Sequence, residues 1–97
     1  MNAYIKGISY YLPSAVLDNQ ALNDSFPEWS ADKISSKTGI YQRKIAAKEE
    51  FTSDMAIKAA EQLFSEYNID RNQIDFILLC TQSPDYFLPT TACILQD

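Results

Sequence analysis

No histidine occurs among the 97 residues of this sequence. Histidine is the commonest general base, the usual partner of serine and cysteine nucleophiles, and a frequent zinc ligand. Only two glycines are present, Gly7 and Gly39, which is too few for a glycine-rich phosphate-binding loop. The residues present therefore predict no catalytic residue and no metal site.

Positive charge is also scarce, and no hydrophobic run is long. Lysine and arginine number 8 against 13 aspartates and glutamates, and the net charge of −5 argues against nucleic acid or an anionic membrane as partner. The same acidic balance also suits plain solubility. No segment reaches membrane-spanning length, and no basic region precedes an apolar stretch, so a cytoplasmic location is predicted.

The two cysteines, Cys80 and Cys93, do not have the spacing of a metal or redox motif. Both fall in apolar surroundings, and we expect two buried, reduced thiols, with no disulfide between them. With 46% hydrophobic residues, the composition is that of a globular chain. The length predicts one domain.

The chain is organised around its last third. Phe76–Cys80 is a continuous apolar run, which indicates a β-strand covered on both faces. Polar residues and a proline follow at Thr81–Asp85, and Pro89 can occupy the first position of a helix. In open α/β sheets, sites lie beyond the carboxyl ends of strands, so a site is predicted in the loop Thr81–Leu88.

The remaining elements can be predicted from caps and periodicity. They are a strand in Ala3–Leu12, a short helix capped by Asp18 or Asn19, a helix Ala31–Thr38 between Ser30 and Gly39, a strand in Ile40–Ala46, a long helix that Thr52–Asp54 caps and Asn68 stops, and a single turn at Asp70–Gln73. This order predicts an α/β fold in one domain, residues 1–97.

That domain is expected to be incomplete. A strand that is apolar on both faces needs helices on both sides and parallel neighbours. The sequence offers one long helix and the start of another. The missing elements would come from further chain, from another subunit, or from both.

Several short motifs occur in an order that is typical of one enzyme family. They are Tyr11-Leu12-Pro13, Lys37-Thr38-Gly39-Ile40 followed by Arg43, Ser53-Asp54-Met55-Ala56, Ile74-Asp75, and Thr81-Gln82-Ser83-Pro84-Asp85 followed by Pro89 and Ala92. Together they resemble the N-terminal segment of β-ketoacyl-acyl-carrier-protein synthase III, a thiolase-like condensing enzyme. The resemblance covers essentially the whole chain and implies the N-terminal part of a thiolase-like fold, with a mixed or parallel sheet and covering helices.

The resemblance also implies a reaction and its partners. It implies acyl transfer to a cysteine and a decarboxylating Claisen condensation with malonyl-acyl carrier protein, in fatty acid or related biosynthesis. The family's Cys, His and Asn would lie beyond Asp97, so the chain is expected to be an N-terminal fragment that is inactive alone. Cys93 lacks the small-residue setting of the family's nucleophile. Coenzyme A thioester would be a substrate, acyl carrier protein a partner, and no covalent cofactor would be needed.

Four substrate-binding residues follow from the resemblance: Trp29, Lys37, Thr38 and Leu88. The family holds the coenzyme A adenine between a Trp and an Arg, at positions where this chain has Lys33 and Lys37. Trp29 lies four residues earlier, so its stacking on adenine needs a local shift, and ordinary packing is the alternative. These differences suggest another acyl donor, such as one carried on a protein. Leu88 matches a position that reaches across the family's dimer interface, which predicts a homodimer; local packing is its alternative.

Two further interpretations remain open. The chain could be a non-catalytic assembly or binding half-domain that pairs with a partner chain carrying the reacting groups. It could also be a stand-alone α/β interaction domain for which the resemblance misleads. The reading frame downstream would separate the first of these from an enzyme fragment.

Overall fold

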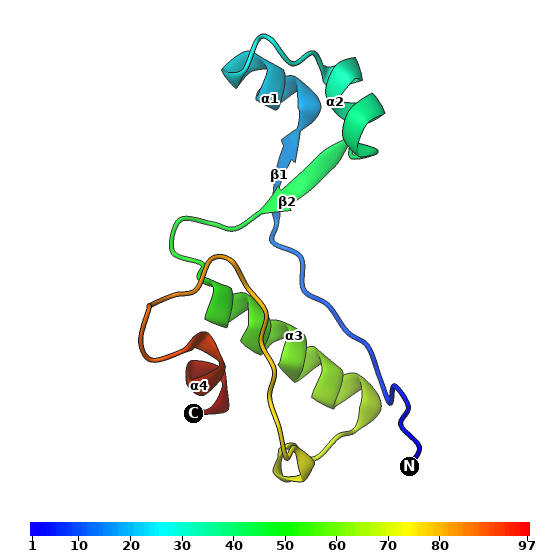
Figure 1. Ribbon diagram of the computed structural model, residues 1–97, viewed down its shortest axis with the longest axis vertical. Coiled ribbons are helices and arrows are strands. Elements are labelled where there is room, and N and C mark those ends of the chain that lie inside the picture. The colour runs from blue at the N-terminus through cyan, green and yellow to red at the C-terminus, as the bar shows by residue number, and fades with distance from the viewer. The chain divides into compact units, whose positions relative to one another are not determined.

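The computed structural model describes residues 1–97 (Figure 1). The chain forms two compact units, one made of Met1–Tyr11 with Glu50–Asp97 and the other of Leu12–Glu49. We call them the α3 unit and the hairpin unit. The expectation of a single domain stays a prediction.

The hairpin unit contains two short strands and two short helices in the order β1 (Ala15–Asp18), α1 (Asn19–Ser25), α2 (Ala31–Thr38) and β2 (Gln42–Ile45). The strands pair antiparallel, with Ala15 opposite Ile45 and Asp18 opposite Gln42. Both helices therefore lie in the connection between the paired strands.

The helix ends of the hairpin unit confirm the caps predicted from the sequence. Asp18 Oδ1 accepts a hydrogen bond from the Ala21 N–H at 2.8 Å, and Ser30 Oγ accepts one from the Lys33 N–H at 3.2 Å. Each satisfies a backbone donor that the helix itself leaves free. Gly39 ends α2 with a φ of 69°, in the left-handed region that glycine adopts most easily.

Asn19 ties the start of α1 to the segment after α2. Its Nδ2 donates to the Ile40 carbonyl at 2.8 Å, and its Oδ1 accepts from Arg43 Nη2 at 3.1 Å. Asn19 is 6% exposed, so these bonds are shielded from water. In the same unit, Ile34 is the buried hydrophobic core residue, at 8% exposed.

The α3 unit is built on α3 (Thr52–Tyr67), followed by η1 (Arg71–Gln73) and α4 (Thr91–Gln96). The long predicted helix is confirmed, although its cap residue is Phe51, whose N–H donates to Asp54 Oδ2 at 2.9 Å. Asn68 stops α3 in the left-handed region, with a φ of 50°. The predicted turn is η1, capped by Asp70. Helix α4 begins at Thr91, so Pro89 precedes the helix instead of opening it.

The N-terminal segment is extended and runs along α3 without strand pairing. The Tyr67 hydroxyl donates to the Ile8 carbonyl at 3.3 Å, and the Tyr11 hydroxyl donates to Glu50 at 2.5 Å. The strand predicted in Ala3–Leu12 is therefore wrong, since the paired strand begins only at Ala15. Tyrosine and isoleucine favour extended backbone, but a strand also needs a neighbour to accept its hydrogen bonds.

The predicted buried strand Phe76–Cys80 is also wrong for this structure. The segment is extended but unpaired, and Phe76 and Leu78 are 80% and 85% exposed. Cys80 and Cys93 are exposed, so the expectation of buried thiols is wrong too. The physical reason is the one that predicted an incomplete domain: no second strand of the chain lies beside this segment, and the single sheet is the antiparallel β1–β2 pair.

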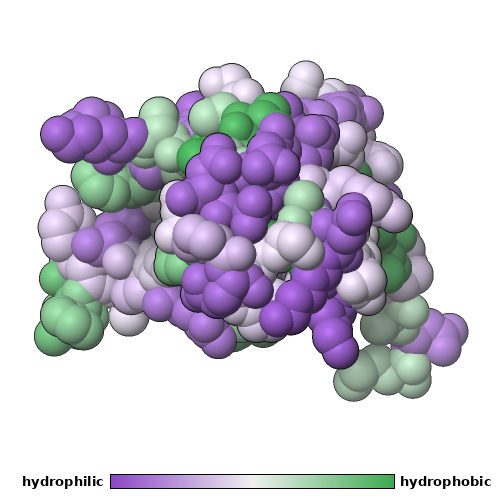
Figure 2. All heavy atoms as spheres, turned by 90° about the horizontal axis from the view of Figure 1, so that it is seen from above, coloured by the Kyte–Doolittle hydropathy of each residue, from purple (hydrophilic) through white to green (hydrophobic).

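The fold class is mixed α/β with a small antiparallel sheet. Hydrophobic side chains reach the surface in several places on the face drawn in Figure 2, between polar ones. No helix is both long enough and apolar enough to cross a bilayer.

Candidate functional site

The loop Thr81–Leu88 is fixed at its base to the first turn of α3. Asp85 Oδ1 accepts from the Ser53 N–H at 3.0 Å, and Asp85 Oδ2 accepts from the Ser53 hydroxyl. The Thr52 hydroxyl donates to the Ser83 carbonyl at 2.5 Å. Within the loop, the Ser83 N–H donates to Thr81 Oγ1 at 3.0 Å.

The other end of this loop is an exposed apolar tip, Tyr86–Leu88. Tyr86 is 63% exposed, Phe87 99% and Leu88 82%. Leu88, one of the predicted substrate-binding residues, therefore has almost no local packing in this structure. Three adjacent exposed hydrophobic side chains are typical of a surface that contacts another molecule or another part of the protein.

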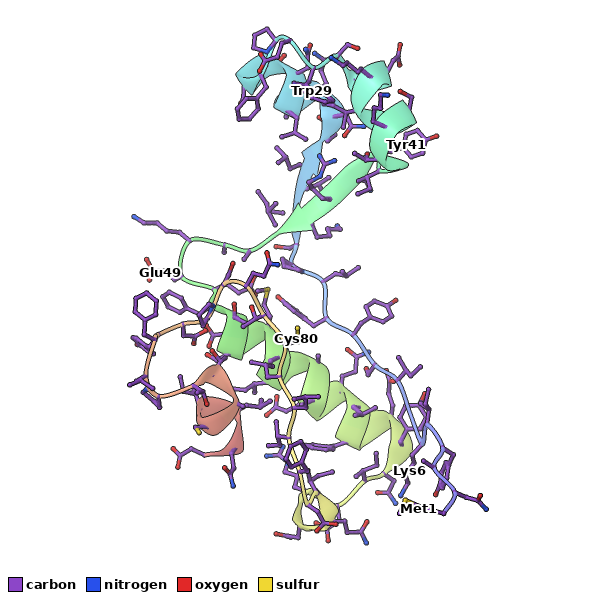
Figure 3. All side chains as sticks on the ribbon, in the orientation of Figure 1. Met1, Lys6, Trp29, Tyr41, Glu49 and Cys80 are labelled. Carbon is purple, nitrogen blue, oxygen red and sulfur yellow. The ribbon has the colours of Figure 1, made fainter.

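The other three predicted residues lie on or next to α2. Figure 3 shows Trp29 in the turn between α1 and α2. The indole is 42% exposed, and Lys33 Nζ lies 4.3 Å from its ring centroid, in a cation–π contact. Lys37 is exposed in the last turn of α2.

Thr38 has a local structural role. Its hydroxyl donates to the Ile34 carbonyl at 2.7 Å and accepts from the Ile40 N–H at 3.1 Å. The hydroxyl therefore supports the end of α2, on both sides of Gly39. The hairpin unit thus brings Trp29, Lys33, Lys37 and Thr38 onto one short helix and its preceding turn, while Leu88 belongs to the α3 unit.

A shallow apolar hollow of about 270 Å³ lies beside the indole. Its lining comes from α1, α2 and the turn between them: Leu22, Phe26, Glu28, Trp29 and Ile34. This hollow could not be predicted from the sequence, because it depends on how the two short helices pack.

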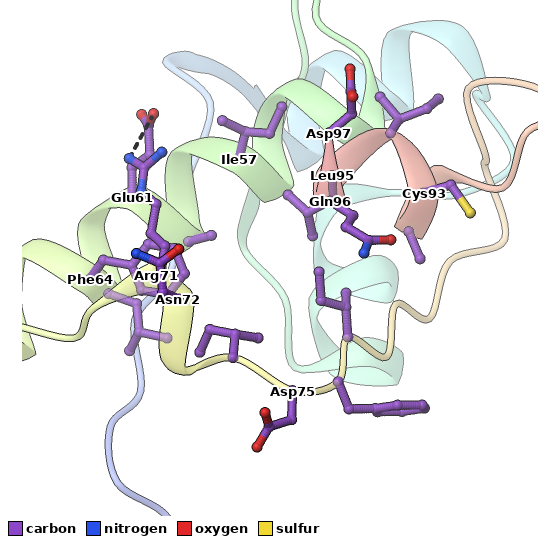
Figure 4. Close-up of a pocket in the computed structure, with 17 residues that line it drawn as sticks. Ile57, Glu61, Phe64, Arg71, Asn72, Asp75, Cys93, Leu95, Gln96 and Asp97 are labelled. Atoms are coloured by element: carbon purple, nitrogen blue, oxygen red, sulfur yellow. Dashed lines mark ion pairs between the residues drawn. The ribbon is translucent and has the colours of Figure 1, made fainter.

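A larger hollow of about 960 Å³ occurs in the α3 unit (Figure 4). Its walls are α3, the extended segment around Phe76 and helix α4. Glu61 and Arg71 form an ion pair at 3.7 Å among the residues that line it. The apolar side chains of α3 that line this hollow are therefore partly open to solvent.

Cys93 is among the residues that line this larger hollow. Its Sγ accepts a hydrogen bond from the Thr90 hydroxyl at 3.2 Å. Cys80 lies on the extended segment shown in Figure 3. Nowhere in the chain do three or more metal-ligating side chains gather.

One charged cluster was not anticipated from the sequence. Lys58 Nζ lies 2.8 Å from Glu50 Oε2 and 3.3 Å from the Tyr11 hydroxyl. The hydrogen bond to Glu50, and next the one to Tyr11, raise the pKa of Lys58 above its ordinary value of 10.5. The cluster connects Tyr11 of the N-terminal segment, Glu50 two residues before α3, and Lys58 on α3 itself. Residues so far apart in the sequence carry no signal of it.

We compared the sequence and the structure of the chain with those of known proteins. No family model matches the chain. The β-ketoacyl-[acyl-carrier-protein] synthase III of Sulfurovum sp. is 42% identical over 99 residues, and that of Chlamydia muridarum is 44% identical over 96 residues. A crystal structure of a 3-oxoacyl-(acyl-carrier-protein) synthase III superposes with a TM-score of 0.83 at 49% identity.

These matches cover nearly all of this chain but a minor part of the other proteins. The two sequence relatives match 98% and 99% of the chain, which spans 28% and 29% of their own length. The crystal structure matches 95% of the chain and 27% of its own. Across almost its whole length, the chain therefore resembles, in sequence and in fold, a segment of β-ketoacyl-[acyl-carrier-protein] synthase III.

Proposed function

We propose that this chain forms part of a β-ketoacyl-acyl-carrier-protein synthase. Such an enzyme transfers an acyl group from a thioester to a cysteine and joins it to malonyl-acyl carrier protein, with loss of carbon dioxide, in fatty acid or related biosynthesis. The observation that carries the proposal is the 42–44% identity to synthases III over 98–99% of the chain. Acyl carrier protein and an acyl thioester are then its partners, and the cytoplasm is its location.

Within that enzyme, residues 1–97 form scaffold and substrate-site wall. No histidine is present, and the hydrogen-bond partner of the Cys93 sulfur is the neutral Thr90 hydroxyl. A thiol in that setting has no base to deprotonate it. The nucleophilic cysteine and the groups that activate it therefore come from residues outside Met1–Asp97.

A condensation assay tests this proposal. The chain is mixed with a polypeptide that carries the remainder of such a synthase, and labelled 3-oxoacyl-acyl carrier protein is measured from malonyl-acyl carrier protein and an acyl primer. Product is expected from the mixture and none from the 97 residues alone. Acylation of Cys93 in the chain alone at enzyme-like rates would overturn the assignment of roles, and no product from the mixture would overturn the function.

The surface of α2 favours an acyl donor carried on a protein over acyl-coenzyme A. An adenine ring that stacked on the face of Trp29 next to Lys33 would have to displace the ammonium 4.3 Å from the ring centroid. Lys37 offers a positive charge for phosphate but lacks the flat guanidinium that stacks on a base. The double substitution Lys33→Trp and Lys37→Arg should lower the KM for acyl-coenzyme A. The exposed Lys44→Arg serves as the control that leaves this KM unchanged, and an equal KM in all three proteins would contradict the donor assignment.

The tip Tyr86–Leu88 supports a second copy of the protein as partner. Leu88, at 82% exposed, would line the acyl site of that copy. Sedimentation should show a dimer for the synthase, and Leu88→Asp should weaken it because a charge replaces an apolar contact. A monomer at high concentration would count against this arrangement.

The exposed apolar side chains also favour a second candidate function, a non-catalytic half-domain that pairs with a partner chain. Phe76 and Leu78 are 80% and 85% exposed on a backbone segment with no strand partner. Such a segment can add a strand from another chain. The condensation assay separates the two candidates, because the half-domain would bind its partner without any product being formed.

A further inference from the structure

The contacts at the base of the loop Thr81–Leu88 play no part in the chemistry proposed above. They join residues that lie more than 30 positions apart in the sequence, Ser53 with Asp85 and Thr52 with Ser83. Ser53 is 6% exposed, so its two hydrogen bonds to Asp85 are shielded from water. Charge-assisted hydrogen bonds in such surroundings are among the stronger ones in proteins.

A carboxylate that accepts two hydrogen bonds from one residue fixes orientation as well as distance. Oδ1 accepts from the Ser53 backbone and Oδ2 from its hydroxyl, so the Asp85 side chain cannot rotate without breaking both. The negative charge also lies at the amino-terminal end of the 16-residue α3, where the helix dipole favours it.

The next residue along the chain begins the exposed tip. Tyr86, Phe87 and Leu88 bury little of their own surface, so packing does little to hold them in place. Their position depends on the two ends of the tip, which are Asp85 on one side and the start of α4 on the other. A partly buried polar contact with Ser53 fixes the Asp85 end to α3, the longest helix of the chain.

We propose that Asp85 is a positioning residue, which clamps the base of the tip to α3 and thereby sets how far Leu88 reaches into the acyl site. The part of this proposal that concerns Leu88 and the acyl site rests on the function proposed above. The clamp itself rests only on the contacts of Asp85, Ser53, Thr52 and Ser83.

The clamp can be tested on the chain itself, without any enzyme activity. In Asp85→Ala, the Ser53 amide should exchange with solvent about tenfold faster, and chymotrypsin should cut after Tyr86 and Phe87 about tenfold faster, because both hydrogen bonds to Ser53 are lost. Asp54→Ala is the matched control. It removes the other carboxylate at the same helix end, whose hydrogen bond from the Phe51 N–H lies outside the loop. Equal cleavage of the tip in the two variants would overturn the clamp.

Two further variants keep this test decisive if Asp85→Ala loses helical circular dichroism. Asp85→Asn can still accept from the Ser53 N–H and can donate to its hydroxyl, so cleavage of the tip should stay within about threefold of the parent. Thr52→Val removes the hydroxyl that donates to Ser83 and should raise cleavage in the same direction as Asp85→Ala. No increase in Thr52→Val, or a loss in Asp85→Asn as large as in Asp85→Ala, would overturn the proposal.

In the active synthase, the same substitutions give a readout that a purely structural role would not produce. Asp85→Ala should raise the KM for medium-length acyl donors about tenfold and leave kcat with the shortest donor within twofold, whereas Asp54→Ala should change neither. If the synthase has no condensing activity at all, the proposed function is wrong, and the cleavage experiment still decides about the clamp. Normal donor-length preference in Asp85→Ala, with a loosened tip, would overturn the role of Asp85 in the acyl site.

Discussion

Gly7 offers a sharp test of how the N-terminal segment docks on α3. A Cβ atom at this position would lie 2.8 to 2.9 Å from three carbon atoms of the Tyr67 ring, Cδ2, Cε2 and Cγ. Carbon atoms in contact are normally 3.5 to about 4.0 Å apart, so the ring must move in Gly7→Ala. Gly7 is not among the positive-φ residues, so the backbone itself can accept alanine.

The cost of Gly7→Ala follows from what the ring has to give up. Adding a methyl group to a filled space costs about 1–3 kcal/mol, and the lower end applies because Tyr67 is 44% exposed and can rotate outward. Rotation also breaks the 3.3 Å hydrogen bond from the Tyr67 hydroxyl to the Ile8 carbonyl, worth about 0.5 kcal/mol at that length. We expect a loss of about 1–2 kcal/mol in the free energy of unfolding.

A double-mutant cycle measures the clash directly. Urea unfolding is followed for Gly7→Ala, Tyr67→Ala and the double variant, and Tyr67→Phe separates the ring from its hydrogen bond. Gly7→Ala should be costly in the parent and in Tyr67→Phe but nearly neutral in Tyr67→Ala. An equal cost of Gly7→Ala in all three backgrounds would show that the segment does not lie against Tyr67.

Three other substitutions have expected outcomes. Asn19→Ala should lower the free energy of unfolding by about 1–3 kcal/mol, because the Ile40 carbonyl and the Arg43 guanidinium lose this partner in a partly buried place. A loss below about 0.5 kcal/mol in urea unfolding would contradict this. Gly39→Ala should lower the free energy of unfolding by about 1 kcal/mol, because alanine is strained at a φ of 69°. No steric clash adds to this, since no atom lies within 4 Å of the added methyl group, and an unchanged thermal unfolding midpoint would contradict the prediction. Lys58→Met should lower the free energy of unfolding at pH 7, because the ion pair with Glu50 is lost. The difference in free energy of unfolding between parent and variant should disappear as the pH rises above 10.5 and through the raised pKa of folded Lys58, because the parent then loses the ammonium proton that binds Glu50. A difference that persists in unfolding experiments at higher pH would point to packing instead.

Local chemistry explains which parts of the fold were predictable. The helix Ala31–Thr38 was predicted to the residue, because Ser30 supplies an acceptor at one end and Gly39 the left-handed conformation at the other. Helix α3 and its stop at Asn68 follow from the same kind of signal. These caps act within a few residues, so they need nothing from the rest of the protein.

The strands were not predictable in the same way. Tyr4, Ile5 and Ile8 favour extended backbone, and Phe76–Cys80 does so more strongly, yet neither segment pairs here. Whether an extended segment becomes a strand depends on a second backbone beside it, which composition alone does not supply. The only pair that forms, β1 with β2, starts three residues after the predicted N-terminal strand ends.

In the candidate site, too, local motifs could be predicted from the sequence and contacts between distant residues could not. The motifs led to Trp29, Lys37, Thr38 and Leu88, and whether these bind substrate stays a prediction. The Lys33 contact on Trp29 and the Ser53–Asp85 contact were both missed. Asp85 had been counted only as part of a polar turn, since its partner lies 32 residues away.

The pairing of β1 with β2 has a consequence for how this protein can vary. Because Ala15 lies opposite Ile45, the chain enters and leaves the hairpin unit at neighbouring points, and the two helices between them add no separation at that junction. Antiparallel partners are about 5 Å apart, so a longer, shorter or re-sequenced α1–α2 segment could be exchanged without altering the spacing of the flanking chain. Trp29, Lys33 and Lys37 all lie in that exchangeable segment, so donor preference could diverge between relatives while α3 and its loop stay the same.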